Sequence, residues 1–263
     1  MHTDHDYRIG KDHIVCEDYA ISGIINDVAY AIVCDGCSAS PDVDFGARAL
    51  ALSARETLNN LNCLNETTEY NKFGISTVQR AREVLTKFPL LHPQALDATL
   101  LVAYVKDGIL TCYLYGDGVF IHRSKNNIRL IHIDFLSGAP AYLSYNLDDE
   151  RMGRYNKEAD LSKHVIDTID GSFEPKSLKP FDPVIITSPV LDGDVISVCS
   201  DGINSFRKPN NDSIEWVNLI DEFTKYKNFN GEFVKRRINA FHRQCVKGGI
   251  THYDDISIST ILI

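Results

Sequence analysis

The chain has 263 residues, of which 44% are hydrophobic and 24% charged, as in an ordinary globular protein. Its net charge of −9 argues against a general nucleic-acid-binding protein, and no apolar run approaches the roughly 20 residues of a membrane span. The polar, acidic start of the chain does not resemble a signal peptide, and no Pro/Gly/Ser-rich linker divides the sequence. We therefore expect one domain over residues 1–263, in a cytoplasmic protein without a membrane or nucleic-acid partner.

The N-terminal part predicts a hairpin with acids at its open end. Residues 1–12 lack a clear pattern and are expected to be a loose start. Glu17-Asp18 precedes an alternating stretch over residues 19–25, and a turn leads back into an apolar strand over residues 28–34. This second strand ends abruptly in Asp35-Gly36, where the glycine permits a sharp turn.

Helices and then further strands follow. Asp44 is expected to cap a helix that continues through Leu58, and Pro89 to end a second helix over residues 75–88. Turn signals then separate a meander of antiparallel strands, predicted at residues 98–105, 109–115, 119–123 and 128–133.

The C-terminal part is less regular at first and periodic afterwards. Residues 134–183 hold many prolines and are the least periodic segment. Strands are then expected over residues 182–187 and 194–200, amphipathic helices over 214–223 and 233–246, and a last strand after Asp254-Asp255. Local hairpins of this kind favour antiparallel sheets covered by helices, which is an α+β fold.

Acidic residues stand at the ends of several predicted strands: Asp18, Asp35, Asp201 and Asp254. A single Asp-Gly is typical of a hairpin turn, but four acidic strand ends from distant parts of the chain suggest one shared site. Converging carboxylates repel one another and do not all stay ionised without cations. Mg²⁺ or Mn²⁺, which prefer oxygen ligands, are the cations that such a site would take.

Taken in order, the pieces resemble a known family. They are Glu17-Asp18, Val33-Cys-Asp-Gly36, Asp97-Ala-Thr99, Gly116-Asp-Gly118, Cys199-Ser-Asp-Gly202 and Asp254-Asp-Ile-Ser257. This series is similar to the metal-dependent serine/threonine protein phosphatases of type 2C (PPM-type), in the style of the bacterial single-domain members. The resemblance spans about residues 13–263. It implies a central antiparallel β-sandwich flanked on both sides by pairs of helices, with a flap over the active-site edge within residues 134–183.

The resemblance also implies a site for two Mn²⁺ or Mg²⁺ ions. Asp35 would bridge both ions and the Gly36 carbonyl would bind one. Asp201 and Asp254 would hold one ion, Asp18 would contact the other mainly through water, and Glu17 would act through water. Asp117 would help to hold a third, weaker ion. Asp255 replaces the usual asparagine and is interpreted as a turn residue.

Two positions depart from the family pattern. His13 stands where the family has a phosphate-binding arginine, and Lys11 nearby is an alternative point charge without the bidentate fork of arginine. Cys37 stands where the family has a histidine that can act as a general acid, and a thiol is a poor substitute near neutral pH. His13 is therefore a candidate catalytic residue, for phosphate binding or leaving-group protonation, or else an ordinary turn histidine.

Cys34 and Cys37 form a Cys-x-x-Cys pair, which allows a redox or zinc interpretation. Because no second pair completes a zinc site and Cys34 belongs to a buried strand, reduced thiols are the preferred interpretation.

Three functions are consistent with these observations. The preferred one is hydrolysis of phosphoserine or phosphothreonine in proteins by a metal-activated water, with Asp35, Asp201 and His13 as catalytic residues. A phosphatase-like module with weak or no activity, which binds a kinase or phosphoprotein, is the alternative. A two-metal nuclease is disfavoured by the acidic charge. The expected partners are a phosphorylated protein and a cognate serine/threonine kinase, and the chain is expected to be a monomer.

Overall fold

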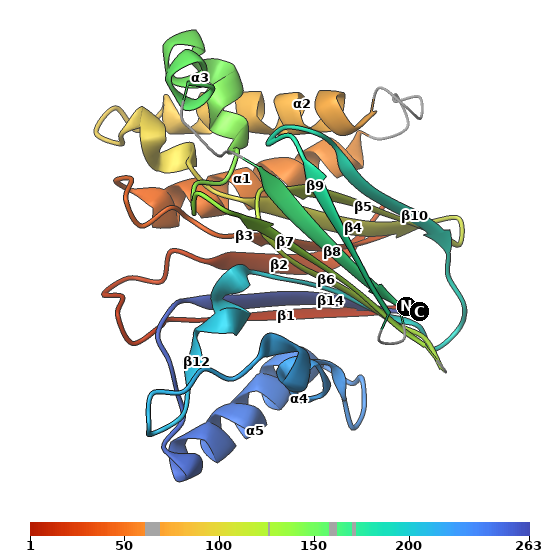
Figure 1. Cartoon of the computed structure of the whole chain (residues 1–263). Helices are drawn as coiled ribbons and strands as arrows, with labels where there is room; N and C mark the ends of the chain where they lie inside the picture. Colours follow the sequence, from red (N-terminus) through yellow and green to blue (C-terminus); the bar gives the residue numbers. More distant parts are fainter. Residues whose placement is uncertain (61–68, 126, 158–161, 170–171) are drawn as a thin grey trace.

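Two antiparallel sheets pack face to face between two layers of helices (Figure 1). The computed structural model describes residues 1–60, 69–125, 127–157, 162–169 and 172–263. Helices α1 (Val43–Asn59) and α2 (Glu69–Leu85) cover one sheet, and α4 (Ile220–Thr224) and α5 (Phe233–Gly248) cover the other. The predicted four-layer α+β sandwich is confirmed.

The larger sheet has seven strands in the order β1-β14-β11-β6-β7-β8-β9, and the smaller has five in the order β10-β5-β4-β3-β2. The strands of the larger sheet are β1 (His2–Arg8), β6 (Gly118–Arg123), β7 (Ile128–Phe135), β8 (Lys163–Ile169), β9 (Ser172–Leu178), β11 (Val195–Cys199) and β14 (Ile256–Leu262). Those of the smaller sheet are β2 (Tyr19–Ile25), β3 (Val28–Cys34), β4 (Leu100–Lys106), β5 (Ile109–Tyr115) and β10 (Val184–Pro189). A short ribbon pairs β12 (Phe206–Arg207) with β13 (Thr251–His252).

Three apolar layers hold the sandwich together. Val33 and Phe120 belong to the layer between the sheets, while Ile32 packs with Leu50 under α1 and α2. A third layer, which includes Phe223, lies between the larger sheet and the α4–α5 pair. Every residue of β3 is buried because both faces of this strand are covered, which explains why it reads as a continuous apolar run.

The expectation of a loose start was wrong. Residues 2–8 form β1, which pairs with β14 along its whole length from His2↔Leu262 to Arg8↔Ile256. The strand is polar, HTDHDYR, because it lies at a sheet edge, so it lacks the apolar signal of a central strand. Its partner β14 lies at the other end of the sequence, so no turn motif between the two strands indicates the pairing.

The predicted meander was wrong at one point. β4 pairs with β5 and β6 pairs with β7, as expected, but β5 and β6 belong to different sheets. The segment Gly116-Asp117-Gly118 therefore carries the chain from one sheet to the other, with positive φ at both glycines.

The helix boundaries also differ from the predictions. Asp42, in a left-handed conformation, is the residue before α1, so Asp44 lies in the first turn and is not the cap. In place of one helix over residues 214–223, a 3₁₀ turn (Trp216–Leu219) leads into the short α4.

The described part of the expected flap region carries regular structure. It contains a 3₁₀ turn (Leu143–Leu147), α3 (Asp149–Tyr155) and the β8–β9 hairpin. That this segment moves over the site stays a prediction. Within the described residues, no helix is both long enough and apolar enough to cross a membrane.

Asp4 links the N-terminal strand to the helix layer. Its Oδ2 accepts hydrogen bonds from the Val234 and Lys235 N–H groups in the first turn of α5, at 2.6 and 3.3 Å. Glu232, directly before the helix, makes no such side-chain cap. A residue of β1 thus caps a helix that lies about 230 positions away in the sequence.

We predict that Asp4→Ala lowers the free energy of unfolding by about 1 kcal/mol, because it leaves two helix N–H groups without an acceptor. Urea denaturation measures this loss. Asp4→Asn keeps an acceptor oxygen and should retain most of the stability. Equal stability of wild type and Asp4→Ala would contradict the capping role.

Candidate functional site

Strand directions bring the acidic ends to one edge of the sandwich. In the larger sheet, β14 starts where its antiparallel neighbour β11 ends, and β6 starts at the same edge. In the smaller sheet, β2 and β4 start where β3 ends. Asp18, Asp35, Asp117, Asp201 and Asp254 flank these strand ends, opposite the edge where the two termini meet (Figure 1). The predicted convergence of acids from distant parts of the chain is therefore what the topology produces.

Asp18 and Asp35 are held by hydroxyl and backbone groups at the end of the smaller sheet. Asp18 is buried, and its Oδ2 accepts a 2.6 Å hydrogen bond from Ser200 Oγ. The Asp35 N–H donates to Thr99 Oγ1 at 3.1 Å, and the Asp35 carbonyl accepts from the Thr99 N–H at 2.8 Å. The Asp18 carboxyl group and the Asp35 backbone are thereby positioned by residues next to the ends of neighbouring strands.

Burial and nearby negative charges raise the pKa of these acids. Desolvation is the main reason that the Asp18 pKa rises to about 7. Desolvation, followed by the charges of Asp18 and Asp201, raises the pKa of Asp35 well above its usual value. The ionised form of each group is disfavoured in the absence of a counter-charge.

The acids from the larger sheet belong to the same electrostatic cluster. Desolvation and then the charge of Asp201 raise the pKa of Asp117, and the same two causes raise the pKa of Asp254. Because Asp201 also raises the pKa of Asp35, it links the acids of the two sheets. The five carboxyl groups therefore form one site electrostatically.

Glycines allow the acid-bearing segments to approach this closely. A Cβ atom on Gly202 would lie 1.7 Å from the Asp255 carbonyl oxygen, so only glycine fits between Asp201 and the start of β14. A Cβ atom on Gly118 would lie 2.8 Å from the Cys199 carbonyl oxygen, and its φ of +129° also favours glycine. Both motif glycines therefore serve the contact between strands.

The donors at this edge fit a hard divalent cation. Asp18 Oδ1 is buried and has no hydrogen-bond partner among the described residues. The bridge between Gly36 and Ala98 uses the carbonyls of Asp35 and Asp97, so the Gly36 carbonyl stays outside these hydrogen bonds. Carboxylate and carbonyl oxygens are the ligands that Mg²⁺ and Mn²⁺ prefer. Within the described part of the chain, however, no group of three or more His, Cys, Asp or Glu side chains is arranged to hold a metal ion. The donor chemistry is therefore present at this edge, although these side chains are not gathered around one point.

Asp255 is a structural anchor rather than a simple turn residue. Its buried carboxylate accepts hydrogen bonds from the Gly10 N–H at 2.7 Å and the Glu17 N–H at 2.5 Å. The loop before β2 is thus tied to the start of β14, next to Asp254. The sequence does not distinguish the adjacent residues Asp254 and Asp255. Only the fold shows that Asp254 belongs to the acidic cluster, whereas Asp255 accepts hydrogen bonds from backbone N–H groups.

His13 faces carboxylates. Its Nδ1 lies 3.1 Å from Asp255 Oδ2, and its Nε2 lies 3.2 Å from Asp254 Oδ1. Glu17 is the third acid nearby, and its Oε2 accepts a 2.6 Å hydrogen bond from Ser38 Oγ. Lys11 Nζ lies 5.0 Å from the centroid of the Tyr253 ring. The catalytic role of His13 stays a prediction, and its observed contacts are those of a residue that links the acidic loops.

Asp97 anchors the other side of the Asp35 loop. Its buried carboxylate accepts hydrogen bonds from Ser144 Oγ at 2.6 Å and from Arg151 of α3 at 2.6 Å. Its carbonyl accepts from the Cys37 N–H at 2.8 Å. The Asp97-Ala-Thr99 motif therefore positions the Asp35 turn and connects it to α3. Cys34 and Cys37 are both free thiols, and burial raises the pKa of Cys34.

A cleft of about 440 Å³ adjoins the acidic edge. It is lined by Asp12, His13, Ser38, Ser205, Arg207, Asn211, Tyr253 and Asp254. Asp254 of the acidic cluster and His13, which contacts it, both line this cleft, so a ligand in the cleft would contact the acidic edge. We call it the edge cleft.

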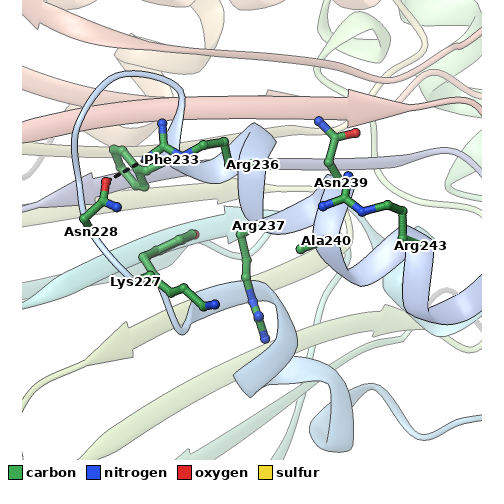
Figure 2. Close-up of a pocket in the computed structure, with 9 residues that line it drawn as sticks. Lys227, Asn228, Phe233, Arg236, Arg237, Asn239, Ala240 and Arg243 are labelled. Atoms are coloured by element: carbon green, nitrogen blue, oxygen red, sulfur yellow. Dashed lines mark hydrogen bonds between the residues drawn. The ribbon is translucent and has the colours of Figure 1, made fainter.

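A second pocket, of about 350 Å³, lies in the helix layer (Figure 2). Figure 2 shows Arg236 and Arg243 on α5 and Lys227 in the preceding loop, with Arg236 hydrogen-bonded to Asn228. None of the five clustered aspartates lines this pocket. It therefore lacks the groups on which the candidate chemistry depends.

Comparisons with known proteins agree with this architecture. A family model described as Protein phosphatase 2C matches residues 9–241. Comparison with curated proteins gives no match.

Several solved structures share the fold. The serine/threonine phosphatase Stp1 from Staphylococcus aureus aligns with a TM-score of 0.60 at 12% identity, over 100% of this chain and 95% of that chain. The Mycobacterium tuberculosis phosphatase PstP/Ppp aligns at 0.51 and 12% identity, over 100% and 99%. A structure of the phosphatase domain and a regulatory-domain fragment of SpoIIE from Bacillus subtilis aligns at 0.55 and 10% identity, over all of this chain and 63% of that one. At such identities the likeness shows the fold alone.

We predict that Asp255→Ala lowers the free energy of unfolding by about 2–4 kcal/mol, because two backbone N–H groups lose their acceptor at a largely buried position. Urea denaturation in the presence of a chelator isolates this effect from metal binding. Asp12→Ala, an exposed change in the same loop, should alter stability by less than about 0.5 kcal/mol. Similar losses in the two variants would contradict the anchoring role.

Proposed function

Because the chain belongs to the protein phosphatase 2C family, we propose that it hydrolyses phosphoserine and phosphothreonine in proteins at a site for two divalent cations. The observation that carries this proposal is the convergence of five buried or half-buried aspartates at one edge. Desolvation raises the pKa of Asp18, and desolvation together with the charge of Asp201 raises the pKa of Asp35, Asp117 and Asp254. A cluster of this kind costs stability unless cations occupy it, so a cation-dependent role gives it a physical reason.

The residues that would hold the cations follow from their positions. Asp35 is close enough to Asp18 on one side and Asp201 on the other to be influenced by both charges, which suits a bridging carboxylate. Asp254 and Asp201 would hold one ion together with the bridge, and the Gly36 carbonyl and Asp18 would serve the other. Asp117 would contribute to a third, weaker site. When bound, two cations supply an activated water and offset the negative charge of the phosphoryl group.

The remaining residues position these ligands. Ser200 and Thr99 orient Asp18 and the Asp35 turn through hydrogen bonds of 2.6 and 3.1 Å. Glu17 receives a hydrogen bond from Ser38 and stands beside His13, where it would act through water. Hydrolysis by an activated water needs no protein nucleophile, which agrees with the burial of Cys34 inside β3. The substrate would be a phosphorylated protein, presented at the edge cleft.

A second candidate is a phosphatase-like module that binds a kinase or phosphoprotein with little or no turnover. His13 in contact with three carboxylates, and the absence of an assembled group of three ligands among the described residues, favour it. The same acids would then serve partner binding without turnover. Direct assay separates the two candidates.

Asp35→Asn tests the cation site. We predict that this variant loses cation-dependent hydrolysis of a phosphopeptide, because the amide removes the charge that balances two dications. In chelator, the variant should unfold at a higher temperature than wild type by a few degrees, corresponding to about 1 kcal/mol, since a repelled buried charge is gone.

Thermal unfolding with and without Mg²⁺ or Mn²⁺ measures both effects. Wild type should gain stability with the cation, Asp35→Asn should not, and Asp192→Asn, an exposed change in the turn between β10 and β11, should behave as wild type. Undiminished hydrolysis after complete cation removal would refute the mechanism. Cation binding without any hydrolysis would favour the binding module.

A further inference from the structure

The edge cleft poses a charge problem for a phosphorylated substrate. Two of its lining residues, Asp12 and Asp254, are acidic, and a phosphate monoester carries a charge of about −1.5 to −2 near neutral pH. Cations at the acidic edge would offset part of this repulsion. A fixed positive group in the cleft wall is still needed to orient the phosphate oxygens.

The candidates for this group near the N-terminus are already engaged. Both ring nitrogens of His13 face carboxylates, within 3.2 Å of Asp254 and 3.1 Å of Asp255. Lys11 is not among the described residues that line the cleft, and its ammonium lies over the Tyr253 ring. Neither residue presents a free donor pair to a ligand in the edge cleft.

Arg207 is the only arginine or lysine among the described residues that line this cleft. Its Nη1 donates to the carbonyls of Asn204 and Phe206, at 2.8 and 2.9 Å, and these two bonds fix the guanidinium. Within the described residues no carboxylate pairs with Arg207, and both of its side-chain hydrogen bonds use Nη1, so Nε and Nη2 remain to face a ligand. The side chain is half-buried, which is unusual for an arginine without an ionic partner.

The backbone places Arg207 between two site aspartates. The chain runs from Asp201 through a short 3₁₀ turn directly into β12, where Arg207 pairs with Thr251 of β13, and β13 leads on to Asp254. The ribbon of β12 and β13 therefore places the Arg207 backbone between the chain segments that carry Asp201 and Asp254.

We propose that Arg207 binds the phosphate group of the substrate in the edge cleft, in place of the arginine that the family carries at the position of His13. The inference rests on the proposed phosphatase function and extends it to substrate recognition. The pre-oriented guanidinium donates two parallel N–H groups to two phosphate oxygens, a geometry that lysine and histidine do not reproduce. It thereby selects phosphate monoesters and places the phosphorus next to Asp254.

The basic pocket of Figure 2 supplies a matched control. Arg243 lines that pocket on α5 and is exposed, and none of the five site aspartates lines the pocket. Replacing it removes the same charge from the same acidic protein. Any long-range effect of net charge on phosphate binding should therefore appear in Arg243→Ala as well.

The test compares Arg207→Ala, Arg207→Lys and Arg243→Ala in two measurements. Steady-state hydrolysis of a phosphopeptide with Mn²⁺ should show a 10- to 100-fold higher KM for Arg207→Ala, about what the loss of a charged hydrogen-bonding group costs, with a smaller change in kcat. Arg207→Lys should fall between wild type and Arg207→Ala because it keeps the charge and loses the fork. Arg243→Ala should match wild type.

Calorimetric titration of inorganic phosphate into the Mg²⁺-loaded protein is the second measurement, and it needs no turnover. Weaker binding by at least tenfold in Arg207→Ala, with Arg243→Ala unchanged, supports the proposal even if wild type proves inactive. Equal phosphate affinity in wild type and both alanine variants would overturn it. Arg207→Lys is the variant to use if Arg207→Ala is too unstable to measure, because lysine keeps a donor for the carbonyls of Asn204 and Phe206. An unchanged KM and an unchanged phosphate affinity in Arg207→Lys would also overturn the proposal.

Discussion

The repulsion among carboxylates at one edge of the sandwich is the constraint on which the rest of the structure depends. Asp18, Asp35 and Asp117 are desolvated as well as close to like charges, and both effects disfavour their ionised forms. The fold keeps them together because each is attached to a strand whose apolar residues are buried in one of three layers. The free energy gained by burying the three apolar layers offsets the repulsion among the carboxylates, and a pair of bound dications would reduce this repulsion.

Two further acids hold this edge in shape through hydrogen bonds from the protein itself. Asp255 accepts the Gly10 and Glu17 N–H groups from the loop before β2, and Asp97 accepts Ser144 and Arg151 from the segment after β7. Their partners are hydrogen-bond donors that compensate the buried charge. The carboxylates at this edge therefore fall into two groups. Asp97 and Asp255 accept several hydrogen bonds and hold the loops together, whereas the five clustered aspartates are the candidate cation ligands.

Positive charge is distributed unevenly around the chain. Arg236 and Arg243 gather on α5, where they meet no clustered aspartate, whereas Arg207 alone among the described arginines and lysines lines the edge cleft. His13, at the position where the family carries an arginine, contacts Asp254 and Asp255. In the proposed mechanism, Arg207 would bind the phosphate group, whereas His13 contacts the acidic loops.

The sequence by itself determined the strand-end acids, the apolar runs that precede them and most of the helices and strands, whereas the four-layer sandwich was implied by the resemblance to the family. These features are local: an alternating or apolar run and the turn that closes it lie within a few residues of one another. Only the tertiary structure decided that residues 2–8 form a strand, that Gly116-Asp117-Gly118 changes sheets, that Asp255 is an anchor and that Arg207 reaches the cleft. Each of these depends on a partner far along the chain, such as β14 for β1 or the Gly10 N–H for Asp255, and contacts over that separation leave no periodic pattern in the sequence.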